Sequence, residues 1–165
     1  MPSLYVVGTP IGNMEDMSAR ALRVLRDVAV IATEDTRTTR KLLTHYDIHT
    51  RLLSFQEHNS AASIPRLLGI LEEGDVALVT EAGTPSVSDP GASLVAAAGE
   101  QGIQVVSIPG PSSVTAAVSI SGFPGERFNF IENGFFFSQG ARFGMNAFVD
   151  VPGNVAPRLS LYINE

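Results

Sequence analysis

Short runs of apolar, β-prone residues alternate along this chain with segments of helical periodicity, and this alternation constrains the fold more than any other feature. Four such runs predict buried strands, at residues 4–7, 28–32, 76–79 and 104–108. Between them, apolar side chains recur at i, i+3, i+4 and i+7, as in residues 21–28 and 64–71, which is the pattern of one buried helix face. Strands joined by single helices predict an α/β fold with a mostly parallel sheet flanked by helices.

The composition excludes several classes of protein. The chain has 165 residues, and its eleven Lys and Arg against seventeen Asp and Glu give a net charge of −6, so the surface as a whole does not attract nucleic acid. The absence of cysteine rules out disulfides, a thiol nucleophile and a zinc–thiolate site. No apolar run is long enough for a membrane span, and no signal peptide precedes the first strand. We therefore expect a cytoplasmic protein that does not contact membranes.

The pattern changes near the carboxyl-terminal end of the chain. Residues 1–125 carry the α/β alternation and are expected to form one domain. Residues 126–165 lack a clear period until a strand-like run at residues 159–163. We interpret 126–165 as an interdomain connection followed by the start of a second, incomplete domain.

Within the first domain, Asp89 and Pro90 predict the cap and first residue of a helix.

Three turns rich in glycine and proline follow three of the predicted strands, at residues 8–13, 81–85 and 109–113. In open parallel sheets, ligands bind at the carboxyl ends of the strands. Glycine lets the backbone approach a ligand closely, and proline fixes the turn. One such turn would be an ordinary connection, but three on one edge favour a ligand site. None matches a dinucleotide fingerprint or a phosphate-binding loop, so backbone groups and hydroxyls are expected to bind the ligand.

A second group of polar residues follows the strand at 28–32. Glu34 and Asp35 come first, and Arg37, Arg40 and Lys41 then form a basic stripe at helical spacing. Carboxylates at a strand end can orient a hydroxyl or accept its proton, and a basic stripe can contact phosphate. For Arg40 and Lys41, a solvated amphipathic face is an equally good interpretation.

The three histidines do not show metal-ligand spacing. His45 and His49 are four residues apart, but the residues between them predict a helix end, and His58 stands alone. We therefore expect surface histidines and no metal site.

Four motifs occur together in a fixed order. They are Leu4 to Asn13, Glu34 to Arg37, Glu81 to Pro85 with Ser88 to Gly91, and Ile108 to Ser112. Together they resemble the N-terminal domain of the 16S rRNA cytidine 2′-O-methyltransferases of the tetrapyrrole methylase superfamily, the class III methyltransferases that depend on S-adenosylmethionine (SAM). The resemblance covers residues 3 to 130. Glu81 departs from the aspartate that is usual in the family, and Thr9 from the usual alanine.

The resemblance implies a function and a site for each motif. It implies transfer of a methyl group from SAM to a ribose 2′-hydroxyl of 16S rRNA in the small (30S) ribosomal subunit, by a homodimer without a metal. The residues that would bind SAM are Pro10, Gly83, Thr84, Pro85, Val87, Ser112 and Ser113. The residues that would bind the RNA substrate are Arg37, Arg40 and Lys41. Glu34 or Asp35 is the candidate general base.

Two other functions remain open at this point. A porphyrin or corrin methyltransferase of the same superfamily is disfavoured, because those relatives usually carry a Gly-Asp-Pro turn where this chain has Gly83-Thr84-Pro85. A non-catalytic binding or dimerisation module would keep the fold without turnover, which the missing part of the second domain would allow.

Overall fold

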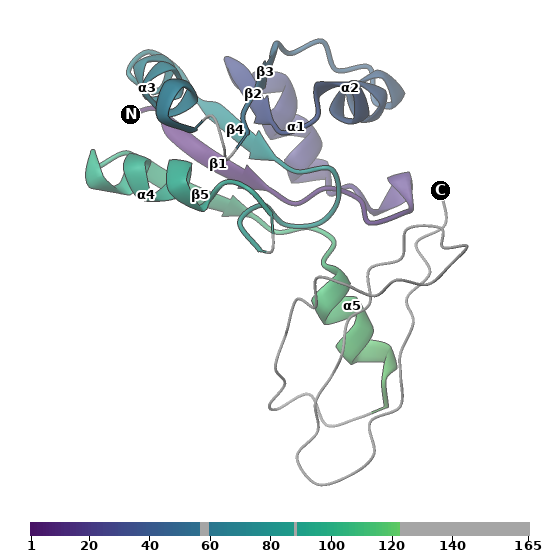
Figure 1. The fold of residues 1–165 in the computed structure, drawn as a ribbon. Helices are drawn as coiled ribbons and strands as arrows, with labels where there is room; N and C mark the ends of the chain where they lie inside the picture. Colours follow the sequence, from purple (N-terminus) through teal and green to yellow (C-terminus); the bar gives the residue numbers. More distant parts are fainter. Residues whose placement is uncertain (57–59, 88, 123–165) are drawn as a thin grey trace, which may run out of the picture. The chain divides into compact units, whose positions relative to one another are not determined.

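The computed structural model describes residues 1–56, 60–87 and 89–122 of the chain (Figure 1). By contact density the chain divides into two compact units, Met1–Pro111 and Ser112–Glu165. In chain order, the elements are β1 (Ser3–Val7), the 3-10 helix η1 (Met14–Asp16), α1 (Ala19–Asp27), β2 (Val30–Thr33), α2 (Thr36–His45), β3 (Leu52–Ser54), α3 (Ser60–Leu71), β4 (Val76–Val79), α4 (Ala92–Glu100), β5 (Gln104–Ile108) and α5 (Ser113–Ile120).

Five parallel strands form one sheet in the order β3-β2-β4-β1-β5, which confirms the predicted α/β fold. β1 pairs with β4 on one side and with β5 on the other, so that Tyr5 lies beside Ala77 and Val106. All four residues of β2 and of β4 are buried, because both strands are covered on their two faces. This explains why they are continuous apolar runs.

Two hydrophobic cores lie on opposite faces of the sheet. On one face, α1 and α2 supply residues such as Leu25 and Leu43, which pack with Ile31 and Ala77 of the strands. On the other face, α3 and α4 pack through leucines such as Leu67 against the alternate strand residues. Figure 1 shows these two helix layers on either side of the strands. The side chains of β2 and β4 alternate between the two cores, as a pleated strand requires.

The connections that leave β1 and β4 go to opposite faces of the sheet, although the two strands are neighbours. β1 leads to α1 on one face, and β4 leads to α4 on the other. In open α/β sheets, such a reversal between adjacent strands is where ligands bind, outside the carboxyl ends. The topology therefore selects the β1–β4 edge as the place to look for a site.

Local details differ from the sequence predictions at three places. The second strand begins at Val30, two residues later than expected. β3 (Leu52–Ser54) was not predicted, because three residues are too few to show a period. α4 begins at Ala92 with Gly91 as its cap rather than at Asp89 and Pro90. Gly91 has a φ of 133°, a conformation that only glycine adopts readily.

The predicted boundary at residue 125 and the strand predicted at residues 159–163 lie outside the described residues, so the assignment of 126–165 stays a prediction.

Candidate active site

The turns that follow β1 and β4 are joined by a pair of backbone hydrogen bonds. The amide of Thr9 donates to the carbonyl of Gly83 over 2.9 Å, and the amide of Gly83 donates to the carbonyl of Thr9 over 3.1 Å. The two residues form an isolated antiparallel bridge between otherwise parallel strands. This bridge lies at the edge that the topology selects, and it gives the candidate site a fixed backbone frame.

Thr9 reinforces this frame through its side chain. The residue is fully buried, and its hydroxyl donates to the carbonyl of Thr80 over 3.2 Å, with a longer contact of 3.4 Å to the carbonyl of Gly83. In the sequence, Thr9 stands out only as a departure from the alanine that is usual in the family. Burial of its hydroxyl beside the end of β4 could not be predicted from local pattern.

The turn after β5 lies equally close to the turn after β1. The amide of Gly8 donates to the carbonyl of Ile108 over 3.1 Å. A Cβ built on Gly8 would stand 2.8 Å from the Cα of Gly110, and one built on Gly110 would stand 2.8 Å from the carbonyl oxygen of Gly8. Neither position can hold a larger residue without displacing the other backbone. Two glycines that sequence reasoning gave no individual role therefore set the spacing of these turns.

The loop between β4 and α4 brings several of the predicted SAM-binding residues to the same edge. Gly83 and Pro85 are buried and Thr84 is half-buried, whereas the side chain of Val87 is 47% exposed. Gly83 has a φ of 83° and Ser86 a φ of 67°. Both lie in the left-handed region, which glycine adopts freely but which costs energy for a residue with a side chain, such as Ser86. The loop thus holds a sharply defined shape.

The remaining predicted SAM-binding residues lie in the turns after β1 and β5. Pro10 directly follows the bridged Thr9 and is half-buried. Ser112 and Ser113 belong to the second compact unit, where Ser112 is the cap residue of α5 and its carbonyl accepts from the amide of Ala116 over 2.9 Å. Both serines are half-buried. Their contact with SAM stays a prediction, as does that of the other predicted residues.

Beyond β2, the two candidate bases occupy different environments. Asp35 is the cap of α2: its carboxylate accepts from the amide of Arg37 over 2.7 Å and from the hydroxyl of Thr38 over 3.0 Å. These hydrogen bonds, above all the one from the Arg37 amide, hold the pKa of Asp35 below its ordinary value. Glu34 directly follows the strand and is exposed. Asp35 is therefore a weaker base than an ordinary carboxylate, and its position is explained by capping.

A shallow hollow of about 590 Å³ runs along α2. Its lining residues are Thr36, Arg37, Arg40, Lys41, Thr44 and His45. The three predicted substrate-binding cations therefore share one surface, and the lining contains no carboxylate. Arg37, Arg40 and Lys41 are all exposed. Such a surface attracts anions even on a chain of negative net charge.

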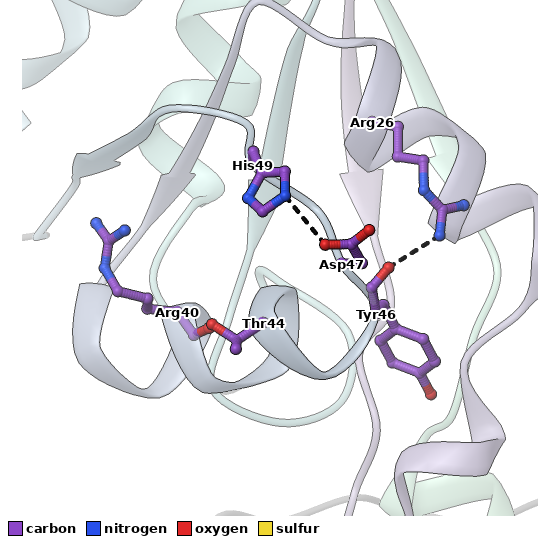
Figure 2. A network of polar contacts seen from close by, with 6 residues as sticks. All are labelled: Arg26, Arg40, Thr44, Tyr46, Asp47 and His49. Atoms are coloured by element: carbon purple, nitrogen blue, oxygen red, sulfur yellow. Dashed lines mark hydrogen bonds and ion pairs between the residues drawn. The ribbon is translucent and has the colours of Figure 1, made fainter.

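The carboxyl-terminal end of α2 is tied to its surroundings by Tyr46. Its hydroxyl donates to the carbonyl of Met14 in η1, and its own carbonyl accepts from Nη2 of Arg26 over 3.0 Å (Figure 2). Partial burial, together with the charges of Glu15 and Asp16, raises the pKa of Tyr46. The phenol therefore remains a donor at neutral pH. Tyr46 links η1 to the basic helix, a role that no sequence motif indicated.

A family model shows where this arrangement belongs. Residues 3–138 match the model described as Tetrapyrrole (Corrin/Porphyrin) Methylases. The chain belongs to the tetrapyrrole methylase family. This confirms the resemblance carried by the four motifs.

Relatives of this tetrapyrrole methylase chain are named as RNA-modifying enzymes. Ribosomal RNA small subunit methyltransferase I of Thermotoga maritima is 52% identical over 131 residues, which cover 79% of this chain and 59% of that protein. The protein of the same name from Halalkalibacterium halodurans is 50% identical over 130 residues, which cover 78% of this chain and 45% of that protein. The chain thus spans about half the length of the curated relatives it matches.

Solved structures show the same fold. Uroporphyrin-III-C-methyltransferase from Thermus thermophilus is 28% identical with a TM-score of 0.55, and the match covers 75% of this chain and 53% of that chain. Diphthine synthase shares the fold with a TM-score of 0.62 at 18% identity, covering 78% of this chain and 52% of its own. The architecture of the tetrapyrrole methylase domain is therefore confirmed as that of class III methyltransferases.

The described residues contain neither a metal-binding cluster nor a membrane-spanning helix. Within residues 1–56, 60–87 and 89–122, no three His, Cys, Asp or Glu side chains gather into a metal-binding group. Over the same part of the chain, no helix combines the length and the apolar character that a membrane crossing requires.

Proposed function

We propose that this chain is the catalytic N-terminal part of an enzyme that transfers a methyl group from SAM to the ribose 2′-hydroxyl of a cytidine in 16S rRNA. The observation that carries the proposal is the bridge between Thr9 and Gly83 at the β1–β4 edge. The sequence identity of 50–52% over about 130 residues to proteins named ribosomal RNA small subunit methyltransferase I supports it. A ribosomal substrate would place the activity in the cytoplasm, on the 30S subunit.

The chemistry of the edge fits SAM. The turns at residues 8–13, 81–87 and 109–111 contain no Lys or Arg, and Glu81 contributes an exposed carboxylate. Carbonyl and carboxylate oxygens without a neighbouring cation suit a positively charged sulfonium. Pro10, Gly83, Thr84, Pro85 and Val87, with Ser112 and Ser113, would hold the donor, mainly through backbone groups and hydroxyls.

When bound, SAM supplies an electrophilic methyl group on a positively charged sulfur. The 2′-oxygen of the ribose forms a bond to the methyl carbon, the carbon–sulfur bond breaks, and its electron pair stays on sulfur to give a neutral thioether. The hydroxyl proton must leave with a base. Because the carboxylate of Asp35 already accepts two hydrogen bonds and has a lowered pKa, we assign this role to Glu34. Most of the acceleration would come from positioning donor and acceptor in line.

The substrate would reach this edge along α2. Arg37 lies in the first turn of the helix, three residues after Glu34, and Arg40 and Lys41 continue the same hollow. Their charges would contact phosphates on either side of the acceptor nucleotide, as cationic side chains do in most RNA complexes.

Two measurements test the proposal on the 165-residue chain. Calorimetric titration should show SAM binding, and methyl transfer from labelled SAM to 30S subunits that lack the modification should follow. Glu34→Gln should abolish transfer while SAM binding persists, whereas Asp35→Asn should retain most of the transfer. Arg37→Ala should raise the KM for the ribosomal substrate and leave SAM affinity nearly unchanged.

Other outcomes would identify other functions. Transfer to a tetrapyrrole precursor and not to 30S subunits would favour the activity named for the Thermus thermophilus structure. An absence of SAM binding at millimolar ligand would favour a non-catalytic module. Size-exclusion chromatography with light scattering tests the predicted homodimer.

A further inference from the structure

The positive charge of this chain is concentrated in one segment. Seven of the eleven Lys and Arg residues lie between Arg20 and Arg51, which contains only four Asp and Glu. This segment has a net charge of +3, whereas the rest of the chain carries −9. The proposed function uses only Arg37, Arg40 and Lys41 of this set, so it does not account for the other four arginines of the segment.

The two helices of this segment, α1 and α2, lie on one face of the sheet. α1 and α2 pack side by side in the same core, on the face opposite α3 and α4 (Figure 1). Arg20, Arg23 and Arg26 of α1 are all exposed, as expected for the outer side of a helix whose inner side is apolar. The face covered by α1 and α2 is therefore the basic side of an acidic chain.

A second hollow of about 420 Å³ lies on this part of the molecule. It is lined by Arg26, Val28, Ala29, Asp47, Ile48, His49, Thr50 and Arg51. Ala29 precedes β2 and Arg51 precedes β3, so the hollow lies at the amino ends of these strands. The hollow along α2 starts at the carboxyl end of β2 and reaches His45. The two hollows thus follow one another along α2 and the loop after it.

The second hollow has a well-supported floor and charged walls. Ile48 is buried, and the hydroxyl of Thr50 donates to the carbonyl of Leu25 over 2.6 Å, which fixes the loop against α1. Figure 2 shows Arg26 held by the carbonyl of Tyr46, and Nε2 of His49 facing the carboxylate of Asp47 at 3.0 Å. Asp47 supplies the one carboxylate in the lining, against the two guanidinium groups of Arg26 and Arg51.

We propose that this second hollow, named here the Arg26–Arg51 hollow, is an additional contact for the RNA backbone, remote from the methyl-transfer edge. An RNA strand whose acceptor nucleotide lies beside Glu34 would continue along α2 and place phosphates against Arg26 and Arg51. The inference rests on the proposed function for its direction, since that function puts RNA on α2.

The chemistry of the hollow favours RNA over a protein partner. Docked proteins are held by exposed aromatic or large apolar anchors. Of the described residues, the exposed large hydrophobic ones are Met1, Met14, Val87, Val105 and Ile120, and the hollow is lined by none of them. Phosphate contacts need mainly cations, which Arg26 and Arg51 offer.

The test measures how RNA affinity depends on salt in matched variants of the 165-residue chain. The probe is a labelled 20-nucleotide single-stranded RNA. The variant is Arg26→Gln with Arg51→Gln, and the control is Arg66→Gln, an exposed arginine on α3 at the opposite face. Each lost phosphate contact on a single strand lowers the slope of log K against log salt by about 0.7. The double variant should therefore lose about 1.4 from the slope, and the affinity it loses between 50 and 200 mM salt should be about sevenfold smaller than for the wild type.

The controls separate folding and the proposed function from this surface. Arg66→Gln should keep the wild-type slope. Arg51→Gln alone should lose half of the effect. Because this variant leaves Arg26 and its bond to Tyr46 in place, it tests the surface even if the double variant disturbs that bond. Circular dichroism checks the fold of each variant. A slope in the double variant equal to that of Arg66→Gln overturns the proposal while leaving methyl transfer intact. If the chain binds polyglutamate and not RNA, the proposed RNA contact is overturned in favour of an acidic protein partner. If the double variant shows the slope change but the wild-type chain shows no methyl transfer, the RNA contact at this hollow stands and the proposed function is refuted.

Discussion

Replacing Gly8 by alanine would place a methyl group 2.8 Å from the Cα and 2.9 Å from the nitrogen of Gly110. Both are backbone atoms, so no side-chain rotation can relieve the contact, and the turns after β1 and β5 must separate. Overpacking of this kind costs about 1–3 kcal/mol. The lower entropy of alanine in the unfolded chain offsets about 0.4–1 kcal/mol of this, which leaves a net loss of stability. For a chain of this length, each kcal/mol lowers the midpoint of thermal unfolding by about 2–4 °C.

The matched control is Gly69→Ala in α3, where a Cβ meets nothing within 4 Å. Alanine in an exposed helix interior is expected to stabilise by up to about 1 kcal/mol. Thermal unfolding followed by circular dichroism should therefore move the two variants in opposite directions. SAM affinity should fall only in Gly8→Ala, because only that variant displaces the turns. If Gly8→Ala unfolded at or above the wild-type temperature, the close packing of the two turns would be refuted.

Three further substitutions or conditions test other parts of the frame. Gly83→Ala should destabilise by about 1–2 kcal/mol through its positive φ, since the added Cβ meets only an ordinary contact at 3.6 Å; Gly83→Asn should lose less in the same denaturant titration. The pKa of Asp35 is lowered in the folded chain, so the stability it adds is complete above the ordinary aspartate pKa and is lost as the pH falls through the lowered value. Acid unfolding should therefore shift in Asp35→Ala, and an identical profile would show that the cap contributes nothing. Tyr46→Phe removes the hydroxyl bond to the carbonyl of Met14 and should lower the free energy of unfolding by about 0.5–1 kcal/mol; an unchanged urea midpoint would contradict that bond.

The side chains near the end of β2 show how far local pattern reaches. The polar group from Glu34 to Arg37 was predicted to follow the strand directly, and it does. Whether Asp35 serves as a base or as a helix cap depends on whether the next residues turn into a helix directly, and the structure shows that they do. The choice between Glu34 and Asp35 as candidate base therefore needed hydrogen-bond geometry, not composition.

The strand order shows where local pattern stops. A sequence period reports which face of an element is apolar, so β1, β2, β4 and β5 could be found one by one. It carries no information on which strands pair, because pairing joins residues such as Val6 and Leu78, which are far apart in the chain. β3 was missed for the same reason: its three residues are strand because they pair with β2, not because of their own pattern.

The class of fold, the glycine and proline turns at the carboxyl ends of the strands and the basic stripe of α2 could be predicted from local pattern, since each depends on residues close together in the chain. Local pattern did not predict that the turn after β1 meets those after β4 and β5, that Thr9 is buried there, or that Tyr46 joins α2 to η1. These features depend on contacts between distant segments, and such contacts form only when burial of the two hydrophobic cores brings the strands together in one order.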